Sequence, residues 1–328
     1  MGAITLEQAK LNAVEDYDPA VIDEFRKSSV VLDSLIFDTA VNPAGGGATL
    51  DYGYRRLVTQ RNAAFRELNT EYKPESVTTE KHTVELKVLG GAFEIDRVLA
   101  HIGPRASDEM ALQMAQLIKA TNAKFCDATI NGDTAVDAHG FDGLDKALKD
   151  STTELKGGKD WSKFTNADEA MTILDDLDEA LSVMDEPPTI LFANRRVLAK
   201  IRSAARRASM YTRNPVEGLV GTGGHAVTRE QIGNTILVDP GAKPGTNEDI
   251  IPVVGGKSSI YAVRVGLDGF HGVTTTDGRM LKTFLPDFNA PGAVKRGEVE
   301  LGPVGVALKA TKAAAVLRDV RVAPAGAA

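Results

Sequence analysis

The sequence has little of the chemistry that usually identifies an enzyme, a secreted protein or a membrane protein. Its 328 residues include one cysteine, Cys126, so an intrachain disulfide is excluded and a reducing compartment fits. The five histidines stand apart from one another and from that cysteine, at no spacing typical of metal ligands. No run of 18 apolar residues occurs, and the first residues lack the apolar segment of a secretory signal, so neither a membrane span nor export is expected.

Common catalytic motifs are also missing, including GxSxG, HExxH, CxxC and the EF-hand loop. The stretch VVGGKSS, residues 253–259, ends like a phosphate-binding loop, but Ile251 stands where the first glycine of that loop belongs. We therefore interpret it as a turn between strands. The sequence predicts no catalytic, cofactor-binding or metal-binding residues, and a protein that is not an enzyme.

The overall composition is that of a soluble globular protein, with 43% apolar and 25% charged residues. The length allows two domains, or one domain with a large insertion. A net charge of −7 excludes a protein that grips nucleic-acid phosphates over its whole surface, because such binding needs a basic footprint. Local basic patches remain compatible with this balance.

The first ninety residues contain no segment that would fold alone. We expect residues 1–49 to form an N-terminal arm, because its helical pieces are short and a Gly-Gly-Gly run at 45–47 follows them. Residues 50–90 predict a long β-hairpin whose tip contains Pro74. An isolated two-stranded hairpin is marginal in water, so this one must pack on its own domain or on another subunit.

A long helix is predicted next, from a cap at Ser107 to an end at Gly132. About 24 residues of helix span about 36 Å. One apolar stripe runs along it, which indicates that the helix lies on a sheet. Cys126 is expected to be a small buried hydrophobic residue there.

The later part of the chain predicts an α/β domain over residues 137–285. Helices are expected in 166–186 and 195–211, and a mobile loop at 221–227 within the glycine-rich segment 217–234. The tail, residues 297–322, reads as strands that return to the first domain. Further strands are expected at 189–194, 235–240, 250–255, 259–266 and 279–285.

Charge is sharply separated within this domain. Residues 167–189 hold eight acids and no base, whereas residues 194–214 hold seven bases and no acid. Three interpretations are open: two solvated helix faces, a nucleic-acid patch, or docking of the acidic face of one subunit on the basic face of the next. Head-to-tail contacts of the third kind generate rings, and complementary charge fixes their register.

Several stretches in combination resemble one family. VIDEFRKSSVVLDSLIF, residues 21–37, is similar to its N-terminal arm, and LGGAFEIDRVLA to the strand before its long helix. FCDATINGDTAVDAHGFDGL, residues 125–144, resembles the exit of that helix, and NRRVLAKIR resembles a helix of its second domain. The chain thus resembles the major capsid proteins of tailed bacteriophages, whose HK ninety-seven type fold is shared with encapsulins.

The resemblance implies an α+β fold with an N-terminal arm (1–49), an extended hairpin loop (50–90), a peripheral domain with a spine helix (91–136 and 286–328) and an inserted α/β axial domain (137–285). It implies a structural protein whose pentamers and hexamers form an icosahedral shell around double-stranded DNA in a virion, assembled in the bacterial cytoplasm. A separate scaffolding protein, a portal and decoration proteins are the expected partners; no membrane or cofactor is. The candidate interface residues are Arg55, Arg56, Arg61, Arg66, Lys73, Lys81, Asp175, Asp178, Arg202 and Arg206.

Some members of this family crosslink neighbouring chains through a loop lysine. Lys73 and Lys81 are the lysines that precede residue 87 in the hairpin, but no acceptor can be matched, so no crosslink is assigned. Three alternatives remain: an encapsulin shell that holds protein cargo, an α/β enzyme with a cleft between its domains, and a DNA-binding protein that uses the bases between Arg195 and Arg213.

Overall fold

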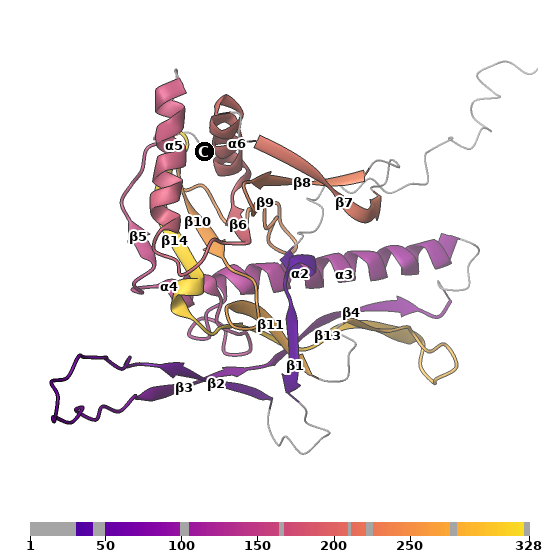
Figure 1. Ribbon diagram of the computed structural model, residues 1–328. Helices are drawn as coiled ribbons and strands as arrows, with labels where there is room; N and C mark the ends of the chain where they lie inside the picture. The colour runs from indigo at the N-terminus through magenta and orange to yellow at the C-terminus, as the bar shows by residue number, and fades with distance from the viewer. Residues whose placement is uncertain are drawn as a thin grey trace, which may run out of the picture.

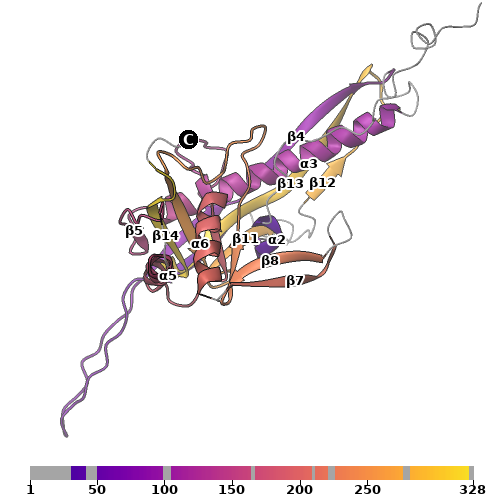
Figure 2. The same cartoon turned by 90° about the horizontal axis from the view of Figure 1, so that it is seen from above.

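The computed structural model describes residues 31–41, 50–98, 105–163, 167–208, 211–220, 226–275 and 281–324. The predicted arm, residues 1–49, lies largely outside these ranges. Within them the chain has an α+β fold built from one five-stranded sheet, one seven-stranded sheet and a separate two-stranded hairpin. The hairpin and the long helix extend from the body of the molecule in different directions (Figures 1 and 2).

The five-stranded sheet supports the long helix α3 (Arg105–Asn131), which packs on β4 and β13. β13 is the centre of this sheet, because it pairs with β4, β11 and β12, while β1 joins in parallel at β11. In Figure 1 α3 runs above these strands, and the short helix α2 (Val31–Ser34) contacts it. The strands are β1 (Phe37–Val41), β4 (Lys87–Asp96), β11 (Phe270–Thr275), β12 (Leu281–Phe284) and β13 (Val294–Leu308).

The seven-stranded sheet carries two helices, α5 (Ala167–Leu181) and α6 (Arg195–Arg207), which contact each other. α6 begins at Asn194, whose side chain accepts a hydrogen bond from the Arg196 N–H as a helix cap. The strands are, in sheet order, β5 (Glu154–Lys156), β14 (Ala314–Arg321), β10 (Lys257–Val263), β6 (Ile190–Ala193), β9 (Thr235–Val238), β8 (Ala226–Ile232) and β7 (Tyr211–Val220).

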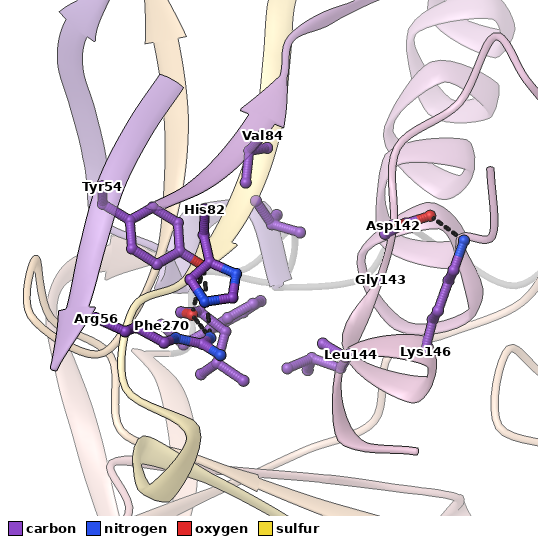
Figure 3. A pocket seen from close by; sticks show the side chains of 12 residues that line it. Tyr54, Arg56, His82, Val84, Asp142, Gly143, Leu144, Lys146 and Phe270 are labelled. Atoms are coloured by element: carbon purple, nitrogen blue, oxygen red, sulfur yellow. Dashed lines mark hydrogen bonds and ion pairs between the residues drawn. The ribbon is translucent and has the colours of Figure 1, made fainter. Parts of the chain in front are cut away.

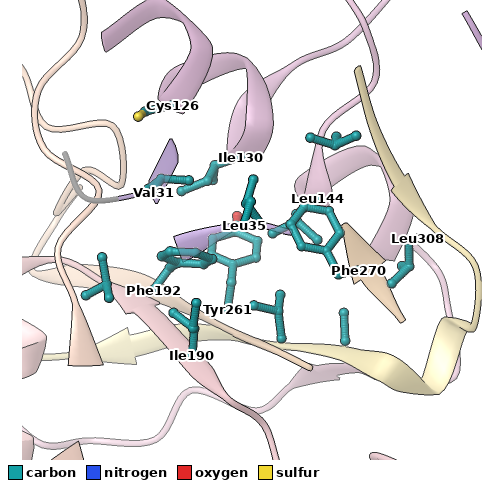
Figure 4. Packing of buried hydrophobic residues seen from close by; sticks show 14 of the residues in the cluster. Val31, Leu35, Cys126, Ile130, Leu144, Ile190, Phe192, Tyr261, Phe270 and Leu308 are labelled. Carbon is teal, nitrogen blue, oxygen red and sulfur yellow. The ribbon is translucent and has the colours of Figure 1, made fainter. Parts of the chain in front are cut away.

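Two large apolar cores hold these layers together, and a third, small cluster packs Tyr52 and Leu86 at the root of the hairpin. The larger core joins the end of α3 and α4 (Leu144–Leu148) to both sheets, with Phe192, Tyr261 and Phe270 at its centre (Figure 4). The smaller core lies between α5, α6 and the seven-stranded sheet. Cys126 is fully buried in the larger core, as expected of a small hydrophobic residue.

Sheet membership differs from the predicted domain boundaries in two places. β11 and β12 fall in the range expected for the axial domain, yet both pair with β13 of the five-stranded sheet. β14 falls in the range expected for the peripheral domain, yet it pairs with β10 and β5. The chain therefore crosses between the two sheets more often than the pattern of apolar residues indicates.

Of the local structures predicted from the sequence, some are confirmed and others are wrong. The turn at 253–259 is confirmed, because Val254 and Lys257 exchange backbone hydrogen bonds across two glycines with positive φ. The cap at Ser107 is wrong, since α3 already begins at Arg105. The strand at 250–255 is wrong because only Val254 forms a bridge there. Of the mobile loop predicted at 221–227, residues 221–225 lie outside the described ranges, and Ala226 and Val227 are the first residues of β8.

Candidate assembly surfaces

The hairpin is long and almost wholly exposed. β2 (Asp51–Leu57) pairs with β3 (Thr79–Glu85), and the chain between them continues to a distant tip (Figure 1). Few contacts tie the tip together, among them the Val58 N–H to the Thr78 carbonyl at 2.9 Å and the Asn62 N–H to Glu75 Oε2 at 2.9 Å. The tip therefore has a defined path without an apolar core of its own.

Large apolar side chains stand out from this tip. Phe65 is 108% exposed, Leu68 is 89% exposed and Tyr72 is 66% exposed. Leu57 and Val58 are exposed beside them. Exposed apolar groups concentrated on one projection mark an interaction surface, because burying them against a partner is favourable.

Five of the six basic hairpin residues proposed from the sequence are exposed: Arg55, Arg61, Arg66, Lys73 and Lys81. The guanidinium of Arg66 lies 5.3 Å from the centre of the Tyr72 ring. Arg56 differs, since it is half-buried and its Nε donates to the Lys309 carbonyl at 2.8 Å. Arg56 thus anchors the hairpin to its own chain.

The root of the hairpin is a buried polar cluster. The Tyr52 hydroxyl donates to Asp38 Oδ2 at 2.7 Å and lies 3.3 Å from Nε2 of the fully buried His271. Burial lowers the pKa of His271, and the nearby ammonium of Lys309 lowers it further. The Tyr54 hydroxyl donates to the Leu308 carbonyl at 2.9 Å. These contacts fix the direction in which the hairpin leaves the body.

A cavity of about 330 Å³ lies beside this root (Figure 3). Tyr54 and His82, stacked with ring centres 5.6 Å apart, form one wall, and the segment from Asp142 to Lys146 forms the other. The ammonium of Lys146 lies 2.9 Å from Asp142 Oδ1 and 2.7 Å from Asp133 Oδ1. The hydrogen bond from Lys146 lowers the pKa of Asp133. Two carboxylates thus share one ammonium, and this group keeps a net negative charge.

The turn after α3 explains the sequence NGD, residues 131–133, followed by FDGL, residues 141–144. The Gly143 N–H donates to the Gly132 carbonyl at 2.8 Å, so the two ends of this loop are in contact. A Cβ at Gly132 would lie 2.3 Å from the Phe141 carbonyl oxygen, and one at Gly143 would lie 2.5 Å from that of Ala128. Both positions therefore require glycine, and Phe141 and Leu144 are thereby placed in the larger core.

Charged groups at the junction of α4 with the seven-stranded sheet also have partners. The Tyr261 hydroxyl donates to Asp145 Oδ1 at 2.6 Å, and Arg318 donates to Asp145 and Glu154. Although burial opposes ionisation of Glu154, hydrogen bonds from Lys156, the Asp150 N–H and Arg318 hold its pKa at about 2. This network joins α4 to β14 and β10.

The four remaining candidate interface residues lie on α5 and α6 and differ in their exposure. Asp175 and Asp178 lie exposed on α5, and Arg206 lies exposed in the last turn of α6. Arg202 is half-buried, and its guanidinium lies 3.0 Å from Glu230 of the same chain. The structure therefore leaves three of these four residues available to a neighbouring subunit and commits Arg202 to an internal ion pair.

The described ranges hold neither a cluster of metal ligands nor a helix suited to span a membrane. No group of three or more His, Cys, Asp or Glu side chains there is arranged to hold a metal ion. None of the helices in those ranges combines the length and apolar character needed to cross a membrane. The side chain of Arg213, the last of the seven bases, falls outside what the structure describes.

No family model and no curated protein matches this sequence. Solved structures match along nearly its whole length. An encapsulin complex from Synechococcus elongatus PCC 7942 is similar with a TM-score of 0.64 and 16% identity, covering 99% of each chain.

Two capsids show the same likeness. The capsid of a native GTA particle gives a TM-score of 0.62 at 11% identity over 98% of this chain and 99% of that one. The capsid of Myoviridae phage XM1 gives 0.59 at 13% identity over 97% and 99%. At these identities the likeness establishes the fold, and the chain has the HK ninety-seven type fold that these capsids and the encapsulin share.

Proposed function

We propose that this protein is a shell-forming structural protein, and specifically the major capsid protein of a tailed bacteriophage, whose copies close into an icosahedral head around double-stranded DNA. The observation that carries the proposal is the hairpin, whose tip exposes Phe65, Leu68 and Tyr72 far from any core of the same chain. A surface of this kind is stabilised when it lies on a neighbouring subunit. A fold similar to shell proteins over the whole chain supports the same function.

In this proposal the seven-stranded sheet and its helices surround the five-fold and six-fold axes, and the hairpin spans to the next subunit. The exposed basic residues of the hairpin contribute to that contact. A separate scaffolding protein, a portal and decoration proteins complete the head. The head forms in the bacterial cytoplasm, and the packaged DNA is held inside without sequence-specific binding.

An encapsulin-type compartment is the second candidate, because the encapsulin complex is similar over 99% of both chains. The two candidates differ in size and contents. An encapsulin shell is expected to be small and to contain protein, whereas a phage head is expected to be larger and to contain DNA.

The test is negative-stain electron microscopy and light scattering of the purified, expressed protein. Rings, tubes or closed shells of tens of nanometres are expected. Co-expression with the genes that neighbour it, followed by nuclease treatment and analysis of the contents, separates head from compartment. A small oligomer whose melting temperature rises with a small-molecule ligand would instead favour the enzyme interpretation. Strongly salt-dependent DNA binding by the unassembled protein would favour the nucleic-acid one.

A further inference from the structure

An apolar groove with an acidic rim lies at one end of the helical layer on the seven-stranded sheet. It has a volume of about 490 Å³ and is bounded by the end of α5, the loop that follows it and the turn between β8 and β9. Its floor is apolar, with Leu177, Leu181 and Leu237 among the lining residues, and no residue of α6 lines it. We call it the acidic groove because Asp178, Asp185 and Glu186 also line it.

The charge on this rim is only partly neutralised within the chain. Arg264 lies 3.2 Å from Asp185 and 3.7 Å from Glu186, but Asp178 is exposed and has no ion-pair partner among the described residues. α5 contains no base, and Asp175 and Asp178 are three positions apart on one face, where like charges repel. Both aspartates lie beyond the first turn of α5, so an interaction with the helix dipole does not offset their repulsion.

The chain carries a matching surface on α6. Arg206 is exposed in its last turn, and its side chain has no partner within the part of the chain that the structure describes. Two other bases of this helix are engaged internally, Arg195 with Asp239 at 2.7 Å and Arg202 with Glu230 at 3.0 Å. An arginine suits the acidic groove, because its stem covers apolar surface while its guanidinium binds carboxylates.

The groove and the Arg206 end of α6 are two different patches of one subunit. No residue of α6 lines the groove, although α5 and α6 contact each other and Tyr211 of β7 pairs with Ile232 of the groove lining. A closed head-to-tail ring requires two different patches of this kind, so that each copy offers one and receives the other. α5 and α6 lie side by side in Figures 1 and 2, so each copy presents the two patches next to each other.

We propose that the acidic groove receives the Arg206 end of α6 from a second copy of this chain, and that this contact sets the register of the rings from which the shell is built. The inference rests on the proposed shell function and names the residues that would make its ring contact. Asp178 is the expected carboxylate partner of Arg206, and Leu177 and Leu181 are expected to contact its stem.

Charge-swap variants of the full chain test this contact. Asp178→Arg and Arg206→Asp are each expected to lower the assembled fraction about tenfold, since each places like charges together at the interface. The double variant is expected to recover to near the wild-type fraction. Asp175→Arg is the matched control for rescue: it makes the same charge change on the same helix outside the groove, so Arg206→Asp is not expected to restore any assembly that it loses at another contact. Circular dichroism and melting temperature verify that each variant is folded.

The outcomes separate the inference from the proposed function. Wild-type shells together with single variants that assemble normally would overturn the inference alone, as would a double variant no better than the singles. A loss with Asp178→Arg but not with Arg206→Asp would point to another occupant, such as a basic scaffolding segment, and would also overturn it. A wild-type protein that forms no rings or shells even with its expected partners would overturn the proposed function and this contact together.

Discussion

The hairpin tip and the turn at the end of the spine helix differ in how far their own chain buries them. The turn, residues 131–144, places Phe141 and Leu144 in the larger core and holds its two glycines against backbone atoms. The hairpin tip, residues 58–78, leaves every residue exposed, including Phe65 at 108%. The turn is completed by its own chain, whereas in the proposed shell the tip is completed by a neighbouring subunit. Stability should therefore depend on the first region and assembly on the second.

Phe141→Ala should have the largest effect on folding. The side chain is buried and its ring centre lies 6.0 Å from that of Phe125 at the end of α3. Removing it leaves a cavity and should lower the free energy of unfolding by about 3–5 kcal/mol. Urea denaturation of the unassembled subunit measures this. Val136→Ala, in the same loop but 86% exposed, should stay within about 0.5 kcal/mol of wild type. Equal effects of the two variants would contradict the assignment.

Gly143→Ala should have the next largest effect. The added Cβ would lie 2.5 Å from the Ala128 carbonyl oxygen and 2.8 Å from the Gly132 nitrogen, which are backbone atoms that cannot rotate away. The forced shift should cost about 1–3 kcal/mol of folding free energy. Gly157→Ala is the control, because nothing lies within 4 Å of a Cβ there. An unchanged denaturation midpoint for Gly143→Ala would show that the close approach is not needed.

Parts of the fold follow from sequence because the signal is local. Helices α3, α5 and α6 carry an apolar stripe at helical spacing, and the hairpin carries alternation with a turn at its tip. β11 escaped prediction because both of its faces are buried, so Phe270 to Thr275 shows no alternation. Gly272 within it packs against the Phe37 ring, a contact set by tertiary structure alone.

Strand partners and interface residues are harder to predict, since both depend on groups distant in sequence or on another chain. The sequence predicts both β14 and β13 as strands of the same domain, yet β14 pairs in the seven-stranded sheet and β13 in the five-stranded one. Arg56 and Arg202 look like their exposed neighbours in sequence, and only the structure shows that one binds a backbone carbonyl and the other Glu230. Conversely, sequence alone gave no sign that His271 lies buried beneath the hairpin root, because its partners Tyr52 and Asp38 are more than 200 residues away.

Acid should also lower the stability of the folded chain through the hairpin root, by less than either the Phe141 or the Gly143 substitution. Burial and Lys309 lower the pKa of His271 from 6.5 in the folded state, although Asp38 opposes them. The unfolded chain therefore binds a proton at His271 more readily than the folded chain does. The stabilisation that comes from a neutral His271 is complete above about pH 6.5 and is lost as the pH falls below it. Denaturation midpoints between pH 7.5 and 5 should fall, and His271→Gln should flatten that slope. An identical slope in the variant would show that another group is responsible.

Substitutions at the hairpin tip should have the smallest effect on folding and a decisive one on assembly. Phe65→Ser and Leu68→Ser remove apolar groups that are almost fully exposed in the subunit, so the free energy of unfolding should change by less than about 0.5 kcal/mol. If the tip lies on a neighbour, the same changes leave a polar group in an apolar contact, and the yield of shells in electron micrographs should drop at least about tenfold. Val136→Ser, an equally exposed apolar residue away from the hairpin, serves as the control and should leave that yield unchanged. Normal shells from the tip variants would remove the main support for the proposed function, because the exposed tip would then have no partner to explain it.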